Sequence, residues 1–138
     1  MVLYLSETEV HERLNEGLKK SAARAGEFVT AKDKQRPKVL VEFVEGIKTA
    51  AGSAHALAHY QANPKWLDIR DILENIITIG EGIPVFEEAA NPIWIRIQTN
   101  INELLETCKK IYTMKAMKRQ DVLAHLDFRG KNLPDTSQ

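Results

Sequence analysis

The chain has 138 residues, 19 acidic and 19 basic, and a formal net charge of zero. A neutral chain of this length predicts one globular domain and argues against a dedicated nucleic-acid binder. No apolar run approaches the roughly 20 residues that cross a bilayer, and the N-terminus has no signal-peptide pattern. The single cysteine, Cys108, excludes an internal disulfide and fits the cytoplasm, and its apolar neighbours favour a small buried side chain over a nucleophile.

Two long helices are predicted in the first part of the chain. Ser6 with Glu9 forms a capping box, which starts a helix that ends between residues 26 and 33. Pro37 starts a second helix that keeps helical phase as far as Ala62. We expect the two helices to pack closely and antiparallel, because the link is short and each has small residues at its centre: Gly17, Ser21, Ala22, Ala25 and Gly26 in the first, and Gly46, Ala50, Ala51, Gly52, Ser53 and Ala54 in the second.

One six-residue phrase occurs twice between residues 62 and 95. Ala-Asn-Pro-Lys-Trp-Leu starts at Ala62, and Ala-Asn-Pro-Ile-Trp-Ile starts at Ala90. Asparagine is a favoured helix N-cap and proline suits the first helical position, so each phrase predicts the end of one helix and the start of another. The predicted caps are Asn63 and Asn91. The tryptophans Trp66 and Trp94 then lie in the first turns of the third and fourth helices.

The remaining boundaries follow from prolines and glycines. The third helix is expected from Pro64 to about Ile79 with Gly80 as its stop, followed by one or two short turns up to Ala90. The fourth is expected from Pro92 to about Met117, and a last short helix from Arg119 to Phe128. The sequence therefore predicts an all-α, up-and-down antiparallel bundle of four long helices plus a short C-terminal helix, forming one domain over 1–131 with a flexible tail over 132–138.

Two groups of residues could suggest chemistry. His55 and His59 share one face of the second helix, as in zinc-binding helices, but no glutamate follows the first histidine and no third ligand is evident. The alternatives are a metal site and a partly buried, hydrogen-bonded pair, and we expect the second. The pairs Glu87–Glu88 and Glu103/Glu106 lack the Glu-x-x-His motifs of a di-metal bundle. With no nucleophile or phosphate-binding motif, we expect neither an enzyme nor a cofactor.

Charge is balanced overall but segregated along the chain. Seven basic residues oppose two acidic ones between Lys19 and Lys38, and again between Lys109 and Lys131. The middle, from Asp68 to Glu106, has eight acidic residues against two arginines. Three interpretations stay open: cations favoured at helix C-termini, contacts with phosphates of lipid or nucleic acid, and contacts with the acidic middle of a second copy.

A set of short motifs in the middle of the sequence resembles a known family. It contains Gly46-Ile47-Lys48, Leu67-x-Ile69, Ile72-Leu73, the run from Ile79 to Glu87 (Ile-Gly-Glu-Gly-Ile-Pro-Val-Phe-Glu), and Ile101-x-x-Leu104-Leu105-Glu106. This set, over residues 46–110, resembles the helical N-terminal domains of fungal NLR-like (STAND) receptors, which are related to HeLo and MLKL-type four-helix bundles. The resemblance implies a signalling or cell-death bundle that acts by self-assembly, with a membrane as one possible target.

The function that we expect is a non-enzymatic helical protein–protein interaction module that associates with itself or with another protein. A membrane-acting or cell-death bundle, and a metal-binding bundle using His55 and His59, are the alternatives. The residues predicted to make contact are the two tryptophans and the basic residues of the last helical region: Trp66, Trp94, Lys109, Lys110, Lys115, Lys118 and Arg119.

Overall fold

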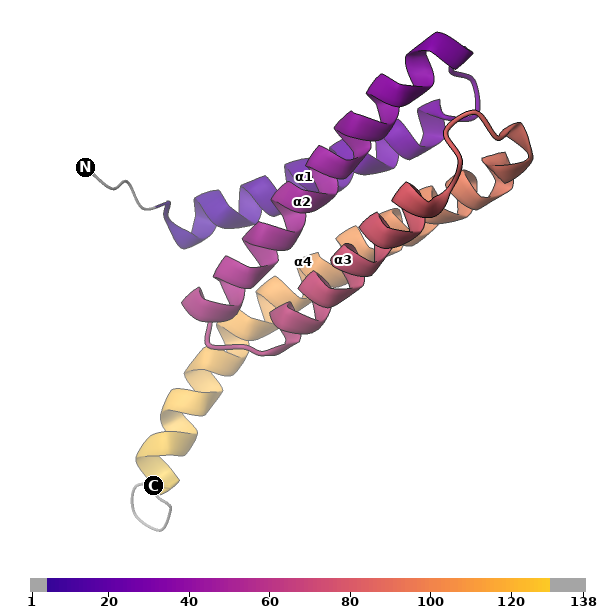
Figure 1. Ribbon diagram of the computed structural model, residues 1–138. Helices are drawn as coiled ribbons and strands as arrows, with labels where there is room; N and C mark the ends of the chain where they lie inside the picture. Colours follow the sequence, from indigo (N-terminus) through magenta and orange to yellow (C-terminus); the bar gives the residue numbers. More distant parts are fainter. Residues whose placement is uncertain (1–4, 130–138) are drawn as a thin grey trace. The chain divides into compact units, whose positions relative to one another are not determined.

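The computed structural model describes the backbone of residues 5–129 and the side chains of residues 5–113, and within this part the chain forms helices and no strand. The all-α class is therefore confirmed. The helices are α1 (Glu7–Glu27), η1 (Asp33–Gln35), α2 (Arg36–Tyr60), α3 (Lys65–Gly82), η2 (Glu88–Ala90) and α4 (Asn91–Arg129), of which η1 and η2 are single 3-10 turns (Figure 1).

The chain divides into two compact units, Met1–Thr107 and Cys108–Gln138. The boundary falls inside α4, whereas the sequence predicted one domain over 1–131. We call them the N-terminal unit and the C-terminal unit. The predicted tail, residues 132–138, lies outside the described residues.

The capping box at the start of α1 is confirmed. The Ser6 hydroxyl accepts a hydrogen bond from the Glu9 backbone N–H at 3.1 Å, and the Glu9 carboxylate accepts one from the Ser6 backbone N–H at 2.8 Å. The backbone N–H of Ser6 is the main cause that holds the pKa of Glu9 below its usual value, with the Ser6 side chain second. The helix ends at Glu27, inside the predicted range.

The close packing of α1 on α2, which their small residues predicted, is also confirmed. A methyl group added at Gly17 would lie 2.6 Å from the Gly46 carbonyl oxygen, and one added at Gly46 would lie 2.9 Å from the Gly17 carbonyl oxygen. Ser21 lies fully buried in this contact, and its hydroxyl donates to the Gly17 carbonyl oxygen at 2.9 Å. The two backbones therefore meet because neither glycine has a side chain.

An aromatic cluster joins all four helical segments of the N-terminal unit. The Phe28 ring, just after α1, stacks on the Trp94 indole of α4 with centroids 4.0 Å apart, and Phe43 of α2 meets that indole edge-on at 5.1 Å. A methyl group at Gly80 of α3 would lie 3.0 Å from the Phe43 ring and 3.3 Å from the Trp94 indole. The prediction that Gly80 stops the third helix is therefore wrong: α3 continues to Gly82, and Gly80 makes room for two aromatic rings.

The last helical region is one helix where the sequence predicted two. Residues 119–128, expected as a separate short helix, belong to α4. The physical reason is that no proline or glycine interrupts the chain between Pro92 and Gly130, so nothing breaks the backbone hydrogen bonds.

Candidate protein-binding site

The two predicted contact tryptophans lie in the core. Trp66 is 0% exposed and Trp94 is 1% exposed. The Trp66 indole N–H donates to the Gln61 side-chain oxygen at 2.8 Å, and the Gln61 amide donates to the Glu7 carboxylate at 2.7 Å. Trp66 thus helps to tie the start of α3 to the end of α2 and the start of α1. Both indoles are therefore covered by the protein's own residues and have no surface for a partner to contact. Burial of such large apolar rings stabilises the fold.

The two copies of the repeated phrase have different roles. Asn63 makes the hydrogen bond that was predicted for a cap, since its side-chain oxygen accepts the Lys65 backbone N–H at 3.1 Å, although α3 begins at Lys65 and Pro64 directly precedes it. Asn91 does not cap a helix: it has helical backbone angles (φ −52°, ψ −40°) and is the first residue of α4. Its side-chain oxygen instead accepts a hydrogen bond from the Arg36 guanidinium at 3.4 Å.

Arg36 is a buried cation that sequence reasoning missed. It is 1% exposed, and its guanidinium donates to the carbonyl oxygens of Phe28 at 2.6 Å and Val85 at 2.5 Å. It also lies over the Phe28 ring, 5.0 Å from the centroid. Among the ion pairs of residues 5–113, none involves Arg36. The guanidinium joins the α1–α2 connection to the α3–α4 connection, and in the sequence it was one member of a basic run with nothing to mark it.

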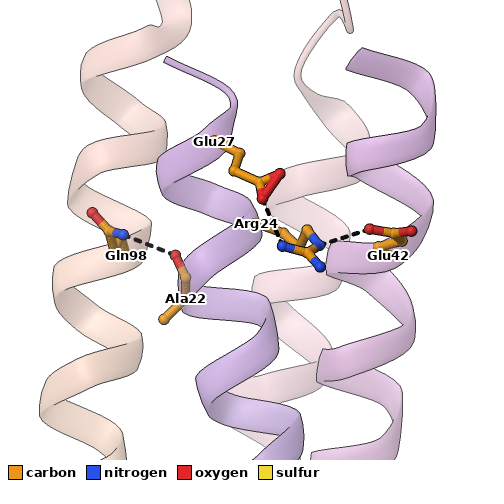
Figure 2. Close-up of polar contacts among 5 residues, drawn as sticks. All are labelled: Ala22, Arg24, Glu27, Glu42 and Gln98. Carbon is orange, nitrogen blue, oxygen red and sulfur yellow. Dashed lines mark hydrogen bonds and ion pairs between the residues drawn. The ribbon is translucent and has the colours of Figure 1, made fainter. Parts of the chain in front are cut away.

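Polar contacts also link α1 to α2 and to α4 (Figure 2). The Arg24 guanidinium donates to the Glu42 carboxylate of α2 at 2.7 Å and to the neighbouring Glu27 at 2.6 Å. The Gln98 amide of α4 donates to the Ala22 carbonyl oxygen of α1 at 2.9 Å. Half-exposed ion pairs of this kind contribute about 0–1 kcal/mol each, so they orient helices more than they stabilise them.

One hollow of the described surface exposes large apolar side chains: a groove between α3 and the first part of α4. It has a volume of about 400 Å³ and is lined by Ile72, Asn75, Ile76, Ile79, Asn100, Glu103, Leu104 and Thr107. We call it the α3–α4 groove. Ile72 and Ile79 are each 46% exposed although they are large and apolar. They are seven residues apart, so they lie on the same face of α3.

The groove offers shape and apolar contact rather than reactive groups. Glu103 is the one ionisable residue among those that line it, and the amides of Asn75 and Asn100 supply donors and acceptors. An apolar floor with a few polar side chains is what a groove for an amphipathic helix requires. Sequence reasoning missed the groove, although a signal was present: Ile72 and Ile79 fall beside the buried positions Ile69, Leu73 and Ile76 and widen the apolar face of α3.

The histidine pair of α2 lies on the surface. His55 and His59 are both exposed, and the Arg70 guanidinium lies 2.8 Å from the His55 Nδ1. The predicted partial burial is wrong, because both side chains are exposed, whereas the predicted hydrogen bond is present for His55. No cluster of three metal-ligating side chains is found in the part of the chain whose side chains are described.

The predicted basic contact residues lie on the C-terminal unit. Lys109 and Lys110 are exposed on α4, and Cys108 beside them is buried. Burial raises the pKa of the Cys108 thiol to about 12, which keeps it protonated and unreactive at neutral pH. The side chains of Lys115, Lys118 and Arg119 lie outside the described residues.

Comparison of the chain with protein-family models, with curated proteins and with solved structures finds no match. The resemblance to the helical domains of fungal receptors, and the functions that it implies, therefore stay predictions. No helix in the described part of the chain combines the length and the apolar character that crossing a membrane requires.

Proposed function

We propose that this chain is a non-enzymatic, cytoplasmic protein–protein interaction module that associates with itself through the α3–α4 groove. An up-and-down antiparallel bundle is the scaffold that we propose for it. In support, α1 packs on α2, α2 packs on α3, and α4 contacts α1 through Gln98 and Ala22. The connections between successive helices are short, which favours antiparallel neighbours.

The observation that carries the proposal is the exposure of Ile72 and Ile79 in a groove whose lining includes one ionisable side chain, that of Glu103. Fully burying an isoleucine side chain contributes about 1.5–3 kcal/mol, so covering the exposed half of each would contribute about 1 kcal/mol. Leu104 on the opposite wall is half-buried and extends the same apolar surface. A partner that covers Ile72, Ile79 and Leu104 together would bury one continuous apolar patch. Such a patch marks an interaction site, whereas single exposed apolar side chains do not.

Light scattering on the wild-type chain and on an Ile72→Glu/Ile79→Glu variant tests this proposal. We expect the wild type to show a mass that rises with concentration above the 15.6 kDa of one chain. The variant should remain at the monomer mass with an unchanged helical circular dichroism spectrum, because two carboxylates would have to be desolvated in the interface.

Val41→Glu is the matched control. Val41 is 55% exposed on α2, away from the residues that line the α3–α4 groove, so this variant should assemble like the wild type. A wild-type chain that stays monomeric at every concentration refutes the proposal. So does a double variant that assembles as well as the Val41 control.

A further inference from the structure

We infer that the occupant of the α3–α4 groove is the basic C-terminal half of α4, residues 108–129, from a second copy of this chain. Copies would then join head to tail rather than face to face. This inference rests on the proposed function, because it names the partner of the same groove.

The charge around the groove decides against face-to-face packing. Residues 68–106, which supply both walls, have eight acidic residues against two arginines, a formal charge of −6. Six of the acidic side chains are exposed on α3 or on the first part of α4: Asp68, Asp71, Glu74, Glu81, Glu103 and Glu106. Glu103 lines the groove and Asp68 stands one helical turn before Ile72 on the same face of α3, whereas Glu74 lines a separate pocket beside α2. Two copies meeting through this face would bring like charges together, which opposes association.

The C-terminal half of α4 has the opposite charge. Residues 109–131 carry seven basic residues against two acidic ones, a formal charge of +5 with His125 neutral. The backbone of residues 108–129 is helical, and this stretch belongs to the C-terminal unit and not to the unit that contains the groove. Residues 19–38 have the same formal charge of +5, but Lys20 and Arg24 there pair with Glu45 and Glu42 of α2, and Arg36 is buried. We therefore choose the C-terminal half of α4 as the basic stretch that complements the acidic walls.

The sequence of this stretch also suits a groove that takes a helix. Ile111, Met114, Val122 and Leu126 recur at multiples of three and four residues, the spacing of one helical face. By the same spacing Lys115 and Lys118 fall on this face too, and Arg119 lies at its edge. Isoleucine, methionine and leucine side chains suit an apolar groove, and a lysine on the same face can lay its methylene groups along apolar surface while its ammonium reaches an acidic side chain.

This contact joins the groove of one copy to the C-terminal half of α4 of another copy. Two kinds of assembly can result. If each copy places its helix in the other's groove, the result is a closed dimer. If each copy passes its helix to the next, the result is an open chain of copies. Both arrangements predict that added salt weakens assembly, whereas face-to-face packing of two acidic surfaces would be strengthened by salt.

Charge exchange between full-length chains tests the inference. One variant makes the helix acidic (Lys115→Glu, Lys118→Glu and Arg119→Glu), and a second makes the groove walls basic (Asp68→Lys and Glu103→Lys). Each variant alone should associate at least about tenfold more weakly than the wild type, because like charges now meet. An equimolar mixture should assemble again, because each acidic helix meets a basic groove and each basic helix meets an acidic groove.

The matched control carries the same charge change elsewhere: Lys19→Glu, Lys38→Glu and Lys48→Glu on α1 and α2, which should assemble like the wild type. Sedimentation velocity on these samples gives separable results. If the groove variant Ile72→Glu/Ile79→Glu fails to assemble but the charge variants assemble normally, the groove still binds a partner copy and this inference is overturned. Failure of the mixture to recover overturns it as well, and a monomeric wild type overturns both proposals.

Discussion

The contact between α1 and α2 makes a sharp prediction about two glycines. Replacing Gly17 by alanine would place a methyl carbon 2.6 Å from the Gly46 carbonyl oxygen and 3.1 Å from the Ala50 backbone nitrogen. An unstrained carbon–oxygen contact is about 3.3 Å or longer, so the two helices must move apart or bend. Both neighbouring atoms belong to the backbone, which cannot turn aside as a flexible side chain can.

The change in the free energy of unfolding that Gly17→Ala causes is the sum of two opposing effects. Alanine in place of glycine stabilises a helix interior by about 1 kcal/mol. Overpacking a tight contact costs about 1–3 kcal/mol. Gly17→Ala should therefore lower the free energy of unfolding by roughly 0–2 kcal/mol, and the clash is isolated by comparison with a glycine that has no neighbour.

Gly52 of α2 supplies this comparison, because a methyl group there meets nothing within 4 Å. Gly52→Ala should stabilise the protein by about 1 kcal/mol through helix propensity alone. Thermal and urea unfolding followed by circular dichroism should place Gly17→Ala about 1–3 kcal/mol below Gly52→Ala, which corresponds to roughly 4 °C in Tm per kcal/mol. If the two variants are equally stabilised, the backbones of α1 and α2 do not meet at Gly17.

Three further predictions concern single residues. Asn63→Ala should cost about 1 kcal/mol in urea unfolding through the lost N-cap of α3, and an unchanged midpoint would mean that the helix begins elsewhere. Ala62 has a left-handed φ of 50° at the end of α2, so Ala62→Gly should stabilise the chain by about 0.5–1 kcal/mol, and a destabilised variant would contradict that backbone conformation. Burial raises the pKa of the Cys108 thiol to about 12, so a thiol reagent at pH 8 should label the folded protein slowly and the urea-unfolded protein rapidly. Rapid labelling of the folded protein would show that the thiol is accessible.

The features that sequence reasoning found are those set by local chemistry. The capping box of Ser6 and Glu9 lies within four residues, so no distant part of the chain is needed to form it. The close approach at Gly17 and Gly46 could be predicted because small residues on two adjacent helices leave few other ways to pack. The Asn63 cap belongs to the same group.

The features that it missed depend on residues far apart in the chain. Asn91 stands in the same phrase as Asn63, yet its partner is Arg36, 55 residues away. Gly80 is typical of a helix end, but it lies inside α3, where the rings of Phe43 and Trp94 leave little room for a side chain. The groove between α3 and α4 likewise forms only when the two helices are placed side by side, so no single segment could reveal it.

The most direct test of the proposed function measures whether the groove is covered when copies assemble. Asn75 is an exposed residue in the wall of the α3–α4 groove, and the buried Cys108 contributes little background to thiol labelling. The labelling rate of an Asn75→Cys variant should fall as protein concentration rises, whereas that of a Val41→Cys variant should stay constant. An Asn75→Cys rate that is the same at all concentrations would contradict self-association through this groove.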